Sequence, residues 1–192
     1  MNTREDGAGA EVISDGSIQT YTGLYVYPLH LDAASVCIED IAHGLSNLCR
    51  YAGHVRTFYS VAEHSCRVAE LLWQRRHHDR LALWGLLHDA SEAYLIDLPR
   101  PLKRAPGFGE IYRAAEARAM DAICDRFGMT VIEPAPVAWA DTVLLLTEQR
   151  DLMPAGVSWA EGWELLPYPI VPMTPAEAEL EFLALFDRLG GS

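Results

Sequence analysis

The sequence predicts an all-α fold, a single helical bundle, from three observations. Apolar residues recur at helical spacing in several separate segments from residue 38 onward. Two segments open with capping boxes, Ser60-Val-Ala-Glu63 and Thr174-Pro-Ala-Glu177. Prolines cluster between the helical segments, in 95–108 and 154–173, where they force loops. A chain of 192 residues is long enough for one domain with a sizeable core and marginal for two.

Each element follows from its local pattern. Residues 1–20 are polar and acidic and are predicted to be a flexible tail, ahead of a single domain over 21–192 with a motif core at about 38–150. Residues 21–37 are aromatic and β-prone, which favours a short extended piece or hairpin. The loop over 154–173 is Pro-rich and is expected to be an ordered loop or lid. Helices are expected at about 38–51, 61–76, 80–94, 109–127, 136–151 and from Pro175 to the glycines at 190–191.

Composition excludes several functions. The 27 acidic residues against 15 basic ones give a formal net charge of −12, which disfavours binding to nucleic acid. The longest apolar run, about 81–87, is far shorter than the ~18 residues that span a bilayer. The N-terminus lacks the basic start and apolar stretch of a signal peptide. We therefore expect a cytoplasmic protein that binds neither membranes nor nucleic acid.

An adjacent histidine and aspartate, His88 and Asp89, follow the very apolar segment 81–87. A charged pair at the end of a core helix is costly unless something compensates it, and a divalent metal would do so. Neighbouring helical side chains diverge by about 100°, so both can reach one ion between them. Glu92 lies three residues after Asp89, on the same face.

Two further residues complete an ordered H…HD…D set. His64 falls early in the helix expected at 61–76, and Asp141 opens an apolar stretch of the helix at 136–151. A single histidine on an apolar helix is more often a core residue than a ligand, and a lone aspartate at a helix start is usually a cap. Together, two imidazoles and two carboxylates make a mixed site suited to Mn, Fe, Co, Ni or Zn.

With these residues in place, the sequence resembles the HD-domain phosphohydrolase superfamily. Segments 60–65 and 87–103 look like its 5′-deoxynucleotidase branch, and Arg50-Tyr51 lies where that branch carries an arginine before a large aromatic residue. Segment 38–54 is similar to compact bacterial and phage relatives, some of which are dATP triphosphohydrolases. The resemblance covers about residues 22–150. Tyr51 stands where tryptophan is expected, which leaves base and sugar preference open.

The resemblance implies roles for the matching residues. His64, His88, Asp89 and Asp141 would hold one divalent metal (Mn, Co, Fe, Zn, Ni or Mg), which would polarise phosphoryl oxygens and activate water. Glu92 is the candidate general acid or base. Asp97 matches a position that orients water or the sugar hydroxyl, the alternative being a turn residue before Leu98-Pro99.

Positive charge near the motif is expected to bind phosphate. Fourteen of the 15 basic residues are arginines, and the single lysine, Lys103, falls beside the predicted site. Guanidinium groups suit bidentate phosphate binding, whereas a lysine acts as a point charge. Tyr51 and His54 could contact base or sugar, with loop packing an equal alternative. The substrate-binding candidates are Arg50, Tyr51, His54, Arg56, Arg100 and Lys103.

We therefore expect a metal-dependent phosphohydrolase that removes 5′-phosphate groups from deoxynucleotides. The substrate would be a dNTP, with dATP one candidate, or a dNMP. One alternative is a non-catalytic nucleotide-binding regulatory module. Another is a cyclic-nucleotide phosphodiesterase, disfavoured because two-metal HD proteins need further histidines and none follows His88. The resemblance also implies a homo-oligomer.

Overall fold

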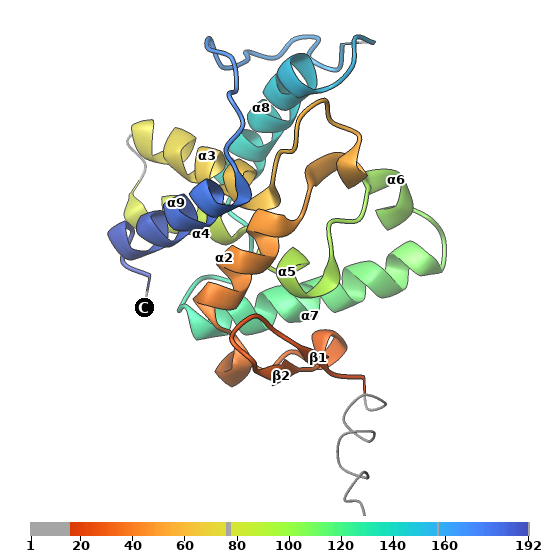
Figure 1. Cartoon of the computed structure of the whole chain (residues 1–192), viewed down its shortest axis with the longest axis vertical. Coiled ribbons are helices and arrows are strands. Elements are labelled where there is room, and N and C mark those ends of the chain that lie inside the picture. Colours follow the sequence, from red (N-terminus) through yellow and green to blue (C-terminus); the bar gives the residue numbers. More distant parts are fainter. Residues whose placement is uncertain (1–15, 76–77, 157, 192) are drawn as a thin grey trace, which may run out of the picture.

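The computed structural model describes residues 16–75, 78–156 and 158–191, and these are mainly helical (Figure 1). The predicted all-α class is therefore confirmed. Most of the tail expected at 1–20 lies outside the described residues. Its last part is not a tail, because Ile18–Gln19 forms strand β1, which pairs antiparallel with β2, Tyr25–Val26. The extended piece thus begins about three residues earlier than the aromatic pattern indicated.

The helices follow in chain order and surround one core. Short 3-10 turns at Pro28–His30 and Ala33–Ser35 link the hairpin to the first long helix, and a third, η3, spans Arg50–Gly53. The helices are α2 Ile38–Asn47, α3 Val61–Gln74, α4 Asp79–Leu87, α5 Glu92–Leu95, α6 Arg100–Lys103, α7 Phe108–Arg126, α8 Ala135–Leu152 and α9 Pro175–Arg188.

The helix expected at 80–94 is two helices. α4 ends at Leu87, and the chain turns through 88–91 before α5 begins at Glu92. Within this turn the backbone bonds run three residues back, from Ala90 to Leu87 and from Glu92 to Asp89, at 3.0 Å each. The break places His88 and Asp89 at the end of α4 instead of inside a continuous helix. Similarly, α2 ends at Asn47, and α6 forms inside the predicted loop.

Helix α3 lies at the centre of the bundle, and ten of its 14 residues are buried. It packs against α2, α4, α8 and α9. The contact with α4 is close at Gly85, where an added Cβ would lie 2.5 Å from Leu72 Cδ1. Glycine therefore allows α4 to lie tightly on α3, which brings the end of α4 beside the first turn of α3. The central core residues include Ile41, Leu45, Val68, Leu72, Leu86, Leu87, Leu144 and Phe182.

The Pro-rich loop before α9 is ordered in its second half, because side chains of α8 and α3 hold its backbone. Arg150 donates to the carbonyls of Leu166 and Tyr168 at 2.8 and 3.0 Å. Glu63 accepts from the Met173 amide at 2.8 Å instead of closing the capping box at Ser60. In Figure 1 the loop runs from the end of α8 back to α9.

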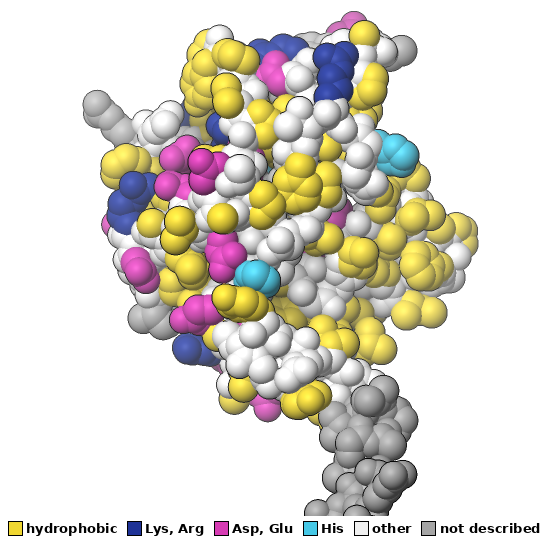
Figure 2. Space-filling model, in the orientation of Figure 1, with side chains coloured by type: hydrophobic (Ala, Val, Ile, Leu, Met, Phe, Trp, Pro, Cys, Tyr) yellow, Lys and Arg dark blue, Asp and Glu magenta, His cyan; other side chains and the backbone are white. Residues whose placement is uncertain are grey.

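Hydrophobic side chains also gather on the surface, over the side of the molecule that carries α6 and α7 (Figure 2). The exposed hydrophobic residues of α6 and α7 include Leu102, Phe108 and Ile111, which are 47–70% exposed. No helix among the described residues is long and apolar enough to cross a membrane.

Candidate metal centre

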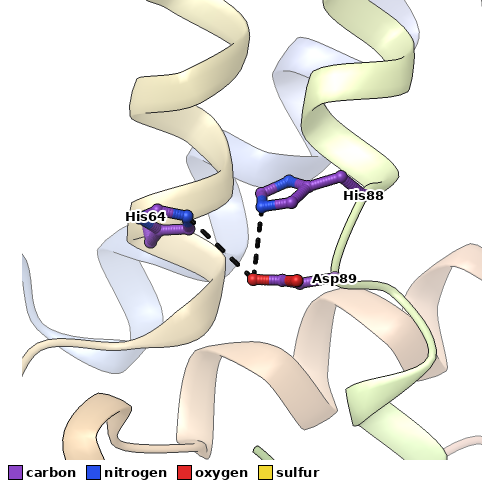
Figure 3. A group of neighbouring side chains, drawn as sticks. All are labelled: His64, His88 and Asp89. Carbon is purple, nitrogen blue, oxygen red and sulfur yellow. Dashed lines mark ion pairs between the residues drawn. The ribbon is translucent and has the colours of Figure 1, made fainter. Parts of the chain in front are cut away.

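Two histidines and an aspartate converge where the first turn of α3 lies beside the end of α4. His64 lies in the first turn of α3, whereas His88 and Asp89 follow the last residue of α4. His64 Nε2 lies 4.0 Å and His88 Nε2 3.3 Å from Asp89 Oδ2, and Figure 3 shows both rings beside this carboxylate. The three donor atoms lie within 4.8 Å of one another, so this cluster could hold a metal ion.

The hydrogen bonds of both histidines leave the same ring nitrogen available. His88 Nδ1 lies 2.8 Å from the Gly85 carbonyl, and His64 Nδ1 lies 2.6 Å from Glu148 Oε1. A ring nitrogen that faces such an acceptor carries the proton, which leaves a lone pair on Nε2. Both Nε2 atoms are buried without a hydrogen-bond partner among the described residues. Two orphaned lone pairs beside a carboxylate fit a bound cation.

The fourth expected ligand, Asp141, comes from α8 and lies beside this cluster. Its Oδ1 atom is 3.2 Å from His64 Nε2, and its Oδ2 atom accepts a hydrogen bond from Arg100 Nη2 at 3.2 Å. It is not part of the compact group formed by the other three residues. The structure therefore brings all four residues of the H…HD…D set together, with Asp141 at the margin.

Glu148 is the residue of this site that the sequence analysis missed. It is fully buried on α8 and accepts hydrogen bonds from His64 Nδ1, Arg50 Nε at 3.2 Å and the Tyr51 hydroxyl at 2.8 Å. A carboxylate in this position fixes the tautomer and orientation of a metal-binding histidine. Its sequence signal is the spacing of seven residues from Asp141, which puts both acids on one face of α8.

The electrostatic field at the cluster favours positive charge. Burial lowers the pKa of His88, but the neighbouring Asp89 carboxylate outweighs this effect and raises the pKa to about 9. Burial and Arg50 lower the pKa of His64, yet Glu148 and Asp141 raise it above its usual value. Burial likewise acts against ionisation of Glu148, but Arg50 and His64 lower its pKa to about 2. The negative charges that raise the pKa values of both histidines would likewise attract a metal cation.

Glu92 occupies the start of α5 and differs from the other acids. It is 4% exposed, and its Oε1 atom accepts a hydrogen bond from Lys103 Nζ at 3.1 Å. Its Oε2 atom is buried without a hydrogen-bond partner among the described residues. Burial and the negative charges of Asp89 and Asp97 raise its pKa well above the usual range, against the effect of Lys103. Glu92 can therefore carry a proton that it could give up.

A cavity of about 720 Å³ opens beside the metal centre. His64 and His88 do not line it, but both contact Asp89, which does. Its apolar lining includes Leu145, Leu146, Met153 and Trp159. The predicted residues that line it are Arg50, Tyr51, His54, Asp89, Glu92, Asp97, Arg100, Lys103 and Asp141.

Strained backbone brings several of these residues to the cavity. Tyr51 and Ala52 in η3 have φ values of +57° and +51°. Ile96, directly before Asp97, has φ +74° and ψ 149°, a conformation that β-branched residues rarely adopt. Such strain costs about 1–3 kcal/mol per residue and concentrates at functional sites.

The basic residues predicted to bind phosphate differ in their burial and in their partners. Lys103 Nζ bridges Glu92 and Glu116, at 3.1 and 2.6 Å, and the Arg100 side chain is 57% exposed at Asp141. Arg50 is buried between Glu148 and Asp89 and forms part of the cavity wall. Arg56 does not line the cavity, because it faces a separate hollow of about 280 Å³ that shares only Met153 with it.

The fold and this site define a helical protein whose clustered histidines and aspartate could hold a metal beside a cavity. No family model matches the chain. It is 34% identical over 180 residues to the Escherichia coli K12 protein named "Uncharacterized protein YfdR". This match covers 90% of this chain and 94% of that protein. It is 41% identical over 133 residues to "Uncharacterized protein RCAP_rcc00048" of Rhodobacter capsulatus, covering 65% of this chain and 66% of that protein. The chain belongs to the YfdR family.

Proposed function

We propose that the protein is a metal-dependent phosphohydrolase of the HD type that removes 5′-phosphate groups from deoxynucleotides. The observation that carries this proposal is the pair of buried Nε2 atoms of His64 and His88, which lack hydrogen-bond partners among the described residues and flank Asp89. The cavity beside them supplies room for a substrate and a buried acid, Glu92.

The donors fit one divalent metal, with Mn, Co, Fe, Zn, Ni and Mg as candidates. His64, His88 and Asp89 would hold it, with Asp141 as the fourth ligand. A metal bound there would supply Lewis-acid chemistry toward a phosphoryl group and a water molecule. Glu148 and the Gly85 carbonyl keep both imidazoles in the tautomer that this requires.

Glu92 is proposed as the general acid. Because its pKa is raised, it can hold a proton on Oε2 and transfer it to the ester oxygen of the leaving group. The hydrogen bond that Lys103 Nζ donates to Oε1 fixes the other oxygen and thereby orients the carboxyl group. Asp97, whose pKa is raised by burial, lines the same cavity and could orient a substrate hydroxyl.

Cavity size and charge favour a small phosphorylated substrate. A volume of about 720 Å³ falls within the roughly 300–1,000 Å³ of small-molecule sites. Arg100 and Lys103 line the cavity and could bind phosphate oxygens, whereas the net charge of −12 opposes a long polyanion. A dNTP and a dNMP both meet these conditions. A cytoplasmic location and a homo-oligomeric state remain part of the proposal.

Incubation with dNMPs and dNTPs, each with Mn²⁺, Co²⁺ or Mg²⁺ and with chromatographic identification of products, tests the proposal. We expect release of phosphate, pyrophosphate or triphosphate. Asp89→Ala should abolish this release, and Glu92→Gln should reduce kcat by about 10²- to 10⁴-fold. Asp125→Asn, at an exposed acid of α7, is the matched control and should retain activity.

Other outcomes would replace this proposal. Full activity in the Asp89 or Glu92 variant would contradict it. Tight nucleotide binding without turnover, whatever the metal, would indicate a non-catalytic regulatory module. Cleavage of cyclic nucleotides with close to two metal ions per chain would indicate a phosphodiesterase.

A further inference from the structure

The cavity has an apolar region that the metal centre does not explain. Leu145 lies one turn beyond Asp141 on α8, and Leu146, Met153 and Trp159 continue this lining. Met153 follows Asp141 by 12 residues, which corresponds to about 18 Å along the helix axis. Along α8 the lining thus changes from the Asp141 carboxylate to apolar side chains.

Trp159 is the largest apolar group in this lining, and its backbone is tied to α8. Its amide donates to the Gln149 side chain at 3.4 Å, about 12 Å along α8 from Asp141. The chain is fixed again at Leu166, whose amide donates to Thr147 Oγ1 at 3.2 Å. Trp159 nevertheless stays 50% exposed. The backbone of Trp159 is therefore anchored to α8 beside the cavity, and about half of the residue's surface is free for a ligand.

We propose that Trp159 is a specificity-determining residue whose indole stacks on the base of the nucleotide. This inference rests on the proposed function. It adds an explanation of how the protein recognises the end of the substrate that does not react. A nucleotide separates its phosphate from a flat aromatic base by one sugar ring, so it would reach from the charged region to the apolar one. Leu145 and Leu146 would cover the remaining apolar edge of the base.

Stacking of this kind favours nucleotides without selecting one base, because every base presents a π face. The apolar residues near Trp159, namely Leu145, Leu146 and Met153, have no side-chain hydrogen-bonding groups that could read a base edge, apart from the weak thioether acceptor of Met153. We therefore expect Trp159 to contribute to the binding of purine and pyrimidine substrates alike.

The test measures binding and needs no turnover. The full-length chain with Mn²⁺ is titrated by calorimetry with a 5′-phosphonate analogue of 2′-deoxyadenosine, in which carbon replaces the ester oxygen and prevents hydrolysis. The matching 1,2-dideoxyribose phosphonate, which has no base, is titrated in parallel. Trp159→Ala should weaken binding of the first ligand by about 5- to 150-fold and leave the second unchanged. Trp159→Phe should restore most of the affinity.

Trp163→Ala is the matched control, because Trp163 lies in the same loop, is 43% exposed and does not line the cavity. It should bind both ligands like the wild type. Three results would overturn the inference: unchanged affinity of Trp159→Ala for the base-containing ligand, an equal loss for both ligands, or no binding of that ligand by the wild type. Failure of the proposed function is a separate result, the absence of hydrolysis by a wild type that binds the ligand.

Discussion

Glu148→Gln perturbs the metal centre without replacing any of the proposed metal ligands. The wild-type carboxylate accepts hydrogen bonds from His64, Arg50 and Tyr51 at 2.6, 3.2 and 2.8 Å while fully buried. Glutamine keeps the shape of the side chain but removes its charge. Loss of such a partner lowers metal affinity by about 10- to 100-fold. Competition with a fluorescent chelator for Zn²⁺ or Mn²⁺ measures this change.

The same substitution should destabilise the metal-free protein. Leaving a buried charge unpaired costs about 3–5 kcal/mol. Because Arg50 Nη1 keeps its ion pair with Asp89 at 3.4 Å, we expect the free energy of unfolding to fall by about 3 kcal/mol. For a chain of this size this corresponds to a fall in Tm of roughly 6–12 °C. The pKa of Glu148 falls from 4.5 to about 2 on folding, so its contribution is present above about pH 4.5. The difference between variant and wild type should therefore shrink as the pH falls toward 2.

Glu164→Gln, at an exposed acid of the loop before α9, is the control and should change neither quantity. A Glu148→Gln protein with wild-type metal affinity would refute the reasoning. If only its stability fell, Glu148 would be a structural residue and would not position His64.

Three further predictions concern the same architecture. Because the pKa of His88 is about 9 without metal, a metal must displace a proton below that pH. Apparent metal affinity should thus rise with pH, by up to about tenfold per pH unit where only His88 must lose a proton, and level off above about pH 9, which calorimetry at several pH values would check; pH-independent affinity would contradict it. Gly85→Ala would place a methyl group 2.5 Å from Leu72 and should cost about 1–3 kcal/mol in urea unfolding, whereas a wild-type midpoint would show that the α3–α4 contact can relax. Ile96→Gly should relieve the unfavourable φ of +74° at an exposed side chain and raise stability by about 1 kcal/mol, and a lower Tm would argue against strain there.

Local patterns predicted the helices well, because their signals are local. The capping box at Thr174 forms as expected, with Glu177 accepting from the Thr174 amide. The break after Leu87 was not predicted, since apolar residues continue through it at helical spacing. In this turn each backbone amide bonds the carbonyl three residues back, whereas in an α-helix it bonds the carbonyl four residues back. The pattern of side chains does not distinguish these two arrangements.

The candidate site was predictable where its residues carry a motif and not where they depend on distant contacts. His64, His88 and Asp89 converge as the H…HD…D spacing indicated. From its place near the end of a helix, Glu148 would be expected to face solvent. Only the fold brings Arg50, 98 positions earlier, into contact with it. Arg56 was placed at the site by its nearness to His64 in sequence. Its amide instead bonds the Leu152 carbonyl, so the chain there follows the end of α8.

Trp159 belongs to the Pro-rich loop that was expected to be an ordered loop or lid, but the sequence could not place it at the cavity. Loops have no periodicity from which the direction of a side chain can be inferred, and the resemblance ended near residue 150. Only the three-dimensional course of the chain after α8 brings this indole to the cavity.

The most direct test of the account is anomalous diffraction from crystals grown with Mn²⁺. We predict a single strong peak between His64 Nε2, His88 Nε2 and the Asp89 carboxylate, with Asp141 as a further ligand, and its loss in Asp89→Ala. Crystals with no peak at this position, or with an unchanged peak in Asp89→Ala, would contradict the assignment of these residues as a metal centre.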